Sequence, residues 1–388
     1  MRPPVYLDNH ATTRVDPRVV EAMVPLLQED YGNAASRQHA FGWKAEAAVE
    51  IARTRLAKLV GALPEEVVFT SGATESINLA LKGVAEARRG RGNRIVIAAT
   101  EHRAVIDTAA RLSNYGFEVT VLGVDRTGLV DPAEVGRAIG PQTILVSVMA
   151  ANNEIGTLAP LEAIGRICRD RGVLFHADAA QAAGKVPVDF NEMNIDLLSL
   201  SAHKMHGPKG VGALVVRNGV SLKPQVDGGG HERGLRSGTL NVPAIAGFGL
   251  AAEIAGTEMQ TESARVGALR DRLVAGLSNA IEGLRVNGHA ARRLTNNTNI
   301  TFPGVAADAL MMAMKDIAVS SGSACSSASP GPSHVLLAIG LSPEEARASL
   351  RFGLGRFTTA EEIEYAIGRI AESYHAVADR FHQHVHAH

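Results

Sequence analysis

The sequence predicts an α/β fold built on a seven-stranded, mostly parallel sheet, with a smaller α+β domain beside it. Between about residues 20 and 255, short apolar runs alternate with longer amphipathic segments, which is typical of helices that cross over a parallel sheet. After about residue 256 the pattern changes to a long amphipathic helix followed by short mixed elements. We therefore expect a large domain over residues 15–255 and a small domain formed by residues 1–14 and 256–388.

Each expected strand of the large sheet is a short apolar run bounded by turn-forming residues. The segments between most of these runs are long enough to hold a helix, which a parallel connection requires. The runs are Val67–Thr70, Arg94–Ala98, Glu118–Leu122, Thr143–Met149, Val173–Asp178, Leu197–Ser201 and Ala213–Val216.

The small domain is expected to begin with a helix over Glu262–Ile281 and to contain a strand over Asn299–Phe302. Two later helices are predicted by capping boxes, in which a hydroxyl residue at the helix start is followed three residues later by a glutamate. These helices would start at Ser342 and at Thr359.

Composition and charge exclude several classes of protein. The 388 residues are 46% hydrophobic and 20% charged, which is close to the globular average. The 39 basic and 40 acidic residues nearly cancel, so no overall field attracts nucleic acid or an anionic membrane. No apolar run approaches the ~20 residues needed to span a bilayer. We expect a cytoplasmic protein that acts on a small molecule, without nucleic-acid or membrane partners.

Lys204 lies in the turn after the strand expected over Leu197–Ser201, three residues beyond its end. Apolar walls around such a turn desolvate a lysine and lower its pKa, as Schiff-base formation requires. If Lys204 stood alone, a solvated loop lysine would be the better interpretation. The polar residues at the other strand ends shift the interpretation towards a functional lysine. Asp178 ends a neighbouring strand, where a buried carboxylate could keep the ring nitrogen of pyridoxal phosphate protonated or could simply cap a helix.

Further polar residues follow other strands. Ser71–Ser76 opens a helix, so its free amides and hydroxyls could seat a phosphate, although an ordinary N-cap has the same pattern. The absence of dinucleotide and Walker motifs favours a monophosphate cofactor. His102 could stack on an aromatic cofactor or shuttle a proton, or could be a satisfied surface histidine. Asn153 and Gln181 could bind the ring oxygen of the cofactor or cap loops.

The chain has two cysteines, too few for a disulfide framework and without the spacing of a zinc site, so no intrinsic metal site is expected. Cys325 lies among small and turn-forming residues in a loop of about residues 318–334, where we expect an exposed, mobile thiol. Cys168 falls on the apolar stripe of a helix and should be buried and inert. Arg351 could bind a carboxylate through two parallel hydrogen bonds or form a structural ion pair.

These motifs resemble the IscS/NifS group of cysteine desulfurases, which belong to the class V aminotransferase-like, fold-type I enzymes that use pyridoxal phosphate. The resemblance covers almost the whole chain. It is carried by Tyr6–Thr13, Thr70–Ser76, Asn152–Gly156, His176–Gln181, Ser201–Gly210, Gly228–Gly234, Arg236–Thr239 and the cysteine loop.

The resemblance implies a site for pyridoxal 5'-phosphate. Lys204 would hold the cofactor covalently, Asp178 would pair with its ring nitrogen, and His102 would stack on the ring. Asn153 and Gln181 would contact the ring oxygen. The phosphate would be bound by Ala73, Thr74, Ser201, His203 and, from the neighbouring subunit, Thr239, which implies a homodimer.

The implied reaction converts L-cysteine to L-alanine. Arg351 and Asn153 would bind the substrate carboxylate, Cys325 would take the sulfur as a persulfide, and His102 would manage the thiol protons. The sulfur would pass to acceptors such as an iron-sulfur scaffold protein, and Cys325 could transiently bind an iron-sulfur cluster. A selenocysteine lyase, an aminotransferase and a non-catalytic sulfur-transfer scaffold of the same fold remain alternative functions.

Overall fold

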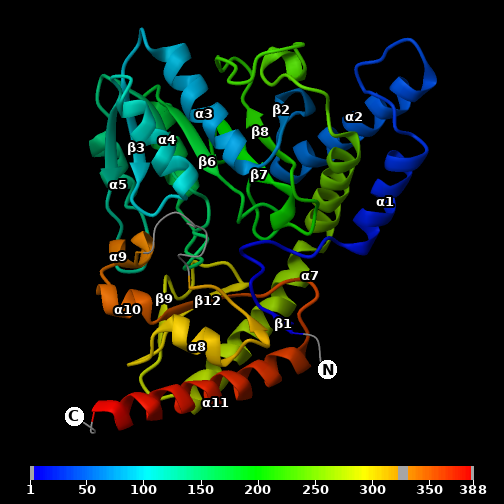
Figure 1. Ribbon diagram of the computed structural model, residues 1–388. Helices are drawn as coiled ribbons and strands as arrows, with labels where there is room; N and C mark the ends of the chain where they lie inside the picture. Colours follow the sequence, from blue (N-terminus) through cyan, green and yellow to red (C-terminus); the bar gives the residue numbers. More distant parts are fainter. Residues whose placement is uncertain (1–3, 322–330, 386–388) are drawn as a thin grey trace.

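The computed structural model describes residues 4–321 and 331–385, with side chains as far as residue 379. A layered α/β unit lies above a smaller unit in the view of Figure 1, and the long helix α7 runs between the two. No helix in the described ranges combines the length and apolarity needed to cross a bilayer.

The large sheet has seven strands in the order β2-β8-β7-β6-β5-β3-β4. β8 is antiparallel to both of its neighbours, and all other adjacent pairs are parallel, which confirms the predicted fold class. Two strands are slightly shorter than predicted. The strands are β2 (Val67–Thr70), β3 (Arg94–Ala98), β4 (Glu118–Leu122), β5 (Thr143–Ser147), β6 (Leu174–Asp178), β7 (Leu197–Ser201) and β8 (Gly212–Val216).

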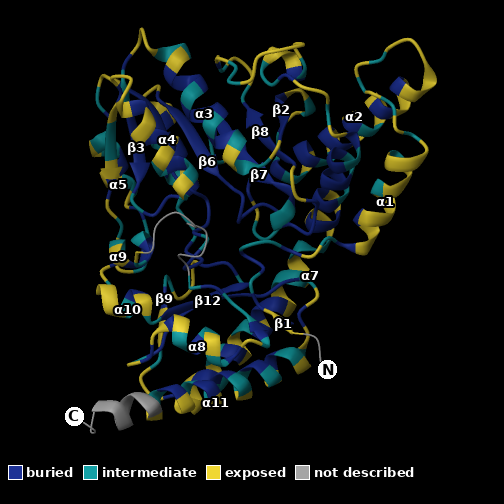
Figure 2. Ribbon diagram, viewed as in Figure 1, coloured by how far each residue is buried: buried dark blue, intermediate teal, exposed yellow. Residues whose placement is uncertain are grey.

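Hydrophobic cores cover both faces of this sheet, so the central strands are apolar on both sides (Figure 2). Successive residues alternate between the faces: Val96 of β3 packs into one core, whereas Ile95 and Ile97 pack into the other. The helices that cover the faces include α1 (Pro17–Gln28), α2 (Ala40–Val60), α3 (Ala73–Arg88), α4 (Arg103–Ser113), α5 (Pro132–Ala138) and α6 (Leu161–Asp170).

The carboxyl ends of the parallel strands meet at one edge of the sheet. β2 also ends there, because it and β7 are both antiparallel to β8. This edge therefore gathers the loops that follow Thr70, Ala98, Ser147, Asp178 and Ser201. In open α/β sheets, ligands bind at this edge.

One helix, α7 (Val242–Ala280), replaces the shorter helix predicted over Glu262–Ile281. Its start is fixed by Asn241, whose side chain accepts the backbone N–H of Ala244. The preceding apolar run is helical because it packs its residues, Phe248 among them, into the core of the large sheet. The predicted domain boundary at residue 255 falls inside this continuous helix, and the division into two domains stays a prediction.

The smaller unit contains a three-stranded antiparallel sheet, β12-β10-β9, and a short parallel pair, β1 and β11. The strand predicted over Asn299–Phe302 begins two residues earlier. The strands are β1 (Val5–Tyr6), β9 (Arg285–Asn287), β10 (Asn297–Thr301), β11 (Ile317–Ala318) and β12 (Ser349–Gly353).

The helices of this unit are α8 (Ala307–Ala313), α9 (His334–Ala338), α10 (Pro343–Arg347) and α11 (Ala360–Val385). Both predicted capping boxes form. The backbone N–H of Ser342 donates to the Glu345 carboxylate over 2.8 Å, and the backbone N–H of Glu345 donates to Ser342 Oγ over 3.1 Å. Thr359 and Glu362 make the same pair of contacts at 2.9 and 3.2 Å.

Candidate active site

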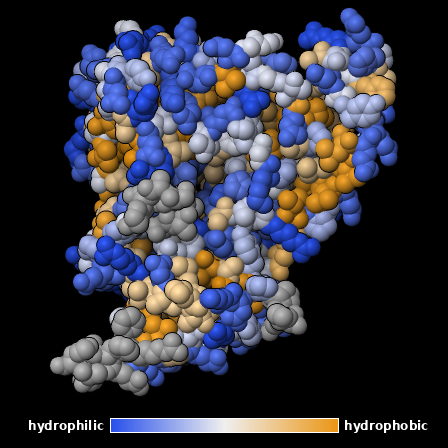
Figure 3. Space-filling view, viewed as in Figure 1, coloured by the Kyte–Doolittle hydropathy of each residue, from blue (hydrophilic) through white to orange (hydrophobic). Residues whose placement is uncertain are grey.

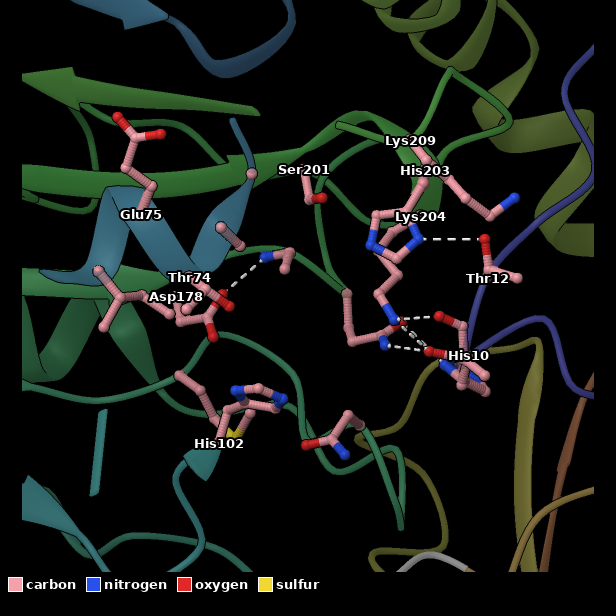
Figure 4. A pocket seen from close by; sticks show the side chains of 18 of the residues that line it. His10, Thr12, Thr74, Glu75, His102, Asp178, Ser201, His203, Lys204 and Lys209 are labelled. Carbon is pink, nitrogen blue, oxygen red and sulfur yellow. Dashed lines mark hydrogen bonds between the residues drawn. The ribbon is translucent and has the colours of Figure 1, made fainter. Parts of the chain in front are cut away.

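A cavity of about 510 Å³ lies at the carboxyl edge of the large sheet, between the strand ends and the N-terminal segment (Figure 4). Most of the residues predicted from the sequence line this one cavity. They are Ala73, Thr74, His102, Asn153, Asp178, Gln181, Ser201, His203 and Lys204.

Two predicted residues lie elsewhere, and a third cannot be placed. Thr239 is exposed and does not line the cavity of its own chain. Arg351 is fully buried and lies directly behind Asn153. Cys325 lies outside the described residues.

Lys204 ends a short 3-10 turn, η2 (Ala202–Lys204), that continues directly from β7. Its Nζ points across the cavity and donates hydrogen bonds to the carbonyl oxygens of His10, over 2.5 Å, and Ala11, over 2.8 Å (Figure 4). The amine is therefore held at the cavity wall by two acceptors of the N-terminal segment. The sequence prediction of a lysine at the carboxyl end of a buried strand is correct in position.

Asp178 is the last residue of β6, and its side chain is buried. Oδ1 accepts the backbone N–H of Ala180 over 2.9 Å. Burial raises the pKa of Asp178, while the nearby His102 and Lys204 favour the charged carboxylate. A buried carboxylate beside a cation is suited to hold a protonated ring nitrogen.

His102 is the N-cap residue of α4, and its Nδ1 accepts the backbone N–H of Ala104 over 3.1 Å. Burial lowers the pKa of His102, so the neutral ring is favoured. Because Nδ1 is an acceptor, the neutral ring carries its proton on Nε2. His102 thus caps α4 through Nδ1 and also lines the cavity, and its Nε2–H is left as a hydrogen-bond donor.

The N-terminus of α3 faces the same cavity. Its N-cap, Gly72, has no side-chain oxygen to satisfy the first amides of the helix, so these N–H groups are available to an anion. A Cβ on Gly212 would lie 2.6 Å from the backbone of Gly72, so glycine there allows β8 to approach the start of the helix. Glu75, an acid in this first turn, is paired with Arg236 at 2.8 Å, which offsets its charge.

Ser201 and His203 also line the cavity, and His203 lies beside Lys204 (Figure 4). His203 Nδ1 lies 3.1 Å from the hydroxyl of Thr12. Burial, together with Lys204 and Lys209, lowers the pKa of His203 to about 4. At neutral pH this ring is therefore a neutral hydrogen-bonding group and not a cation.

Arg351 lies on β12 and carries an ion pair. Its Nη2 donates to Asp8 Oδ1 over 2.8 Å, and its Nη1 donates to the carbonyl oxygen of Asn153 over 3.1 Å. Its Nε is buried without a hydrogen-bond partner among the residues that the structure describes. The structural ion pair weighed in the sequence analysis is present, and the guanidinium still has N–H groups that no described residue uses, one residue behind the cavity wall.

The chain on either side of the undescribed residues 322–330 is attached close to this wall. Ser320 and Arg351 form a backbone bridge, in which the N–H of Arg351 donates to the carbonyl of Ser320 over 2.7 Å. On the other side, the hydroxyl of Ser333 donates to the Glu154 carboxylate over 2.5 Å.

Cys168 is buried on α6, as predicted, and burial raises the pKa of its thiol to about 12. A thiol that stays protonated in a closed core is inert. The prediction that Cys168 is buried is therefore confirmed, and the prediction for Cys325 stays a prediction.

Sequence reasoning missed Asp8, His10 and Lys185. Asp8 pairs with Arg351, and His10 and Lys185 both contact Gln181. The available signal was the polar run Asp8-Asn9-His10 directly after the apolar Val5 and Leu7, in a segment where the family resemblance was noted but no role was given.

The groups in the cavity fit pyridoxal phosphate. The N-terminus of α3 provides unsatisfied amides for the phosphate, Asp178 provides a buried carboxylate for the ring nitrogen, and Lys204 provides an amine for the aldehyde. All three belong to one cavity of a size that suits a small cofactor together with a substrate.

Known proteins with similar sequences cover nearly the whole chain. It is 57% identical over 374 residues to cysteine desulfurase IscS of Anaeromyxobacter dehalogenans, which covers 96% of this chain and 93% of that protein. It is 55% identical to cysteine desulfurase IscS of Methylococcus capsulatus, over 96% of this chain and 93% of that protein.

Solved structures show the same fold. A NifS-like protein matches with a TM-score of 0.89 and 41% identity, over 95% of this chain and 98% of that chain. A NifS-like protein from Rickettsia africae matches with a TM-score of 0.86 and 32% identity, over 96% and 99% of the two chains. The aminotransferase class-V family model matches residues 5–366. The chain therefore belongs to the aminotransferase class-V family.

Proposed function

We propose that the protein is a pyridoxal phosphate-dependent cysteine desulfurase, which converts L-cysteine to L-alanine and retains the sulfur as a persulfide on Cys325. The observation that carries the proposal is the convergence of Lys204, Asp178 and the N-terminus of α3 on one cavity. The IscS cysteine desulfurases at 57% and 55% identity support the choice of reaction.

When bound, pyridoxal phosphate supplies an electron-withdrawing ring that stabilises negative charge at the Cα of an attached amino acid. Asp178 would hold the proton of the ring nitrogen. Ala73, Thr74, Ser201 and His203 would fix the phosphate, and Asn153 and Gln181 would contact the ring oxygen. Lys204 would anchor the cofactor through Nζ and then use the same atom as the base that takes the Cα proton.

His102 and Arg351 would handle the substrate. His102 lines the cavity, so the face of its imidazole could stack on the cofactor ring while its Nε2–H exchanges protons with the substrate thiol. The unused N–H groups of Arg351, with Asn153 beside them, suit the substrate carboxylate.

Sulfur transfer would take place on Cys325. Its thiolate would attack the sulfur of the bound substrate, so that one S–S bond forms while the carbon–sulfur bond breaks. The carbon would keep the electron pair of the broken bond and take up a proton, which gives alanine. The attachments of Ser320 and Ser333 beside Arg351 and Glu154 support the assignment, because they start and end the intervening chain near the cavity.

We also propose a homodimer. Apolar side chains gather on the flank formed by α1 and the start of α2, on the right in Figure 3, and Val20, Leu27, Tyr31, Phe41 and Trp43 are 45–68% exposed there. Isolated monomers rarely expose so many large apolar side chains together. Thr239 is also exposed and lies outside its own cavity, which fits its expected role in the phosphate site of a partner.

The partners and location are proposed on the resemblance to the IscS/NifS group. The persulfide sulfur would pass to an iron-sulfur scaffold protein or other acceptors in the cytoplasm, and Cys325 would serve as a transient cluster ligand.

The test compares Cys325→Ser with Cys168→Ser as the matched control. Both variants should keep the colour of the bound cofactor. Cys325→Ser should lose the one-sulfur adduct in the intact mass after addition of L-cysteine, and Cys168→Ser should retain it. A one-sulfur adduct on the Cys325→Ser variant would contradict the proposal. L-selenocysteine run in parallel distinguishes a selenocysteine lyase, and absence of alanine would indicate a non-catalytic scaffold.

A further inference from the structure

A hydrogen-bonded chain of side chains lies behind Lys204. Gln181 Oε1 accepts from Lys185 Nζ over 3.0 Å and lies 2.9 Å from Nδ1 of His10. Gln181 Nε2 donates to the carbonyl oxygen of His10 over 2.9 Å, and Lys204 Nζ donates to the same oxygen. Neither Lys185 nor His10 has a role in the proposed reaction.

The orientation of the Gln181 amide is fixed by a donor on one side and an acceptor on the other. The amine of Lys185 in either protonation state has N–H groups to donate, so the atom facing it is the amide oxygen. The His10 carbonyl can only accept, so the atom facing it is the amide nitrogen. One N–H of Gln181 Nε2 remains, and Gln181 lines the cavity.

The same contacts determine the tautomer of His10. Because Gln181 Oε1 cannot donate, Nδ1 of His10 carries the proton, and Nε2 is left as a bare acceptor. Nε2 is buried and has no hydrogen-bond partner among the described residues. Burial, together with Lys185 and Arg351, holds the pKa of His10 well below its usual range, so the ring stays neutral.

Lys185 is half-buried in a cationic environment. Burial lowers its pKa to about 7, Lys204 and Arg351 act in the same direction, and Glu262 opposes them. Burying a lysine amine costs free energy unless a hydrogen bond compensates, and Lys185 Nζ donates its hydrogen bond to Gln181.

We propose that Lys185 is a positioning residue that acts through Gln181: it keeps the amide N–H of Gln181 turned into the cavity and holds His10 in the Nδ1–H form. The inference rests on the proposed function for its meaning, because the ring oxygen of pyridoxal phosphate is an acceptor that needs this N–H. The network itself exists without the cofactor, so it can be tested separately.

The first test uses cofactor-free protein labelled with ¹⁵N at histidine, with His10 assigned by difference from His10→Asn. In the wild type, the ¹⁵N shifts should report a neutral Nδ1–H ring from about pH 6 to pH 8. The His10 carbonyl still favours the wild-type orientation of the Gln181 amide, so Lys185→Met should add a minor Nε2–H form of His10 to the Nδ1–H form, and Lys185→Arg should preserve the wild-type signal. Lys223→Met, at an exposed lysine, is the matched control and should change nothing.

An Nε2–H ring in the wild type, or no detectable Nε2–H form in Lys185→Met, would overturn the proposal. The wild-type measurement also decides the case if Lys185→Met fails to fold. Because no cofactor or substrate is present, neither result depends on whether the protein is a desulfurase.

The second test uses the protein loaded with pyridoxal phosphate and follows the pH at which its visible band shifts. Partial loss of the Gln181 donor orientation and removal of a nearby cation both favour a proton on Lys204 Nζ, so Lys185→Met should raise this pH by about half to one unit. Lys185→Arg should restore the wild-type value. A purely structural role predicts lower thermal stability with no change in this pH, and that outcome would contradict the proposal.

Discussion

Replacement of Arg351 by lysine tests how the substrate carboxylate is held. Arg351 is fully buried, and two of its N–H groups are engaged by Asp8 and Asn153. A guanidinium has five N–H groups in a rigid fork, whereas an ammonium is a point charge that cannot reproduce the fork. Arg351→Lys therefore keeps a cation for Asp8 and removes the geometry that a second carboxylate needs.

The expected effect follows from the loss of one charge-assisted hydrogen bond. Such a bond contributes about 1.5–3 kcal/mol, and about 1.4 kcal/mol corresponds to a factor of ten in affinity. The KM for L-cysteine should rise roughly 10- to 150-fold. Because the carboxylate is bound both before and during the chemical step, kcat should change much less.

Initial rates of alanine formation over a range of cysteine concentrations measure both constants. Arg356→Lys is the matched control, because Arg356 is an arginine with only 10% of its side chain exposed and its ion pairs are with Asp16 and Glu262, which do not line the cavity. Its KM should stay at the wild-type value. An unchanged KM in Arg351→Lys, with the fold intact by circular dichroism, would refute the carboxylate assignment.

Three further predictions concern stability and assembly. Burial raises the pKa of Glu154 to about 7, above its unfolded value of about 4.3, so its stabilising effect is present at low pH and is lost as pH rises through 7. The free energy of unfolding of Glu154→Gln, measured with denaturant relative to wild type, should therefore increase by about 2 kcal/mol from pH 5 to pH 8. An equal difference between variant and wild type at both pH values would contradict this. Cys168→Ser should lower the free energy of unfolding by about 1–3 kcal/mol with unchanged alanine production, and loss of activity in a folded variant would show that Cys168 is not inert. Leu27→Asp should be a monomer by light scattering, whereas the control Met312→Asp, at an exposed methionine of α8, should remain a dimer. If both variants remain dimers, the α1 flank is not the interface.

The central strands of the large sheet were predictable because each is a short run buried on both faces. Leu197–Ser201 matches the structure at both ends, and so does the partly exposed edge strand Glu118–Leu122. The start of α7 was not predictable in the same way, because the run Val242–Ala252 is apolar without a clear period, and only its packing against α2 and the sheet makes it helical.

The candidate site was predictable where a polar residue lies at the carboxyl end of a strand or in the turn after it, as Asp178 and Lys204 do. Parallel strands bring such residues to one edge whatever their separation in the sequence. Contacts made by the N-terminal segment were not predictable, because Asp8 meets Arg351 from 343 residues away and His10 meets Gln181 from 171 residues away. Local patterns carry no information on which distant segment closes a cavity.

The central claim is that the amine of Lys204 holds pyridoxal phosphate covalently. Borohydride reduction of the reconstituted protein, followed by peptide mass mapping, tests it most directly. The account predicts one pyridoxyl group per chain, on the peptide that contains Lys204, and none on Lys185 or Lys209 close by. Label on either of those lysines, or no label on a protein that binds the cofactor, would contradict it.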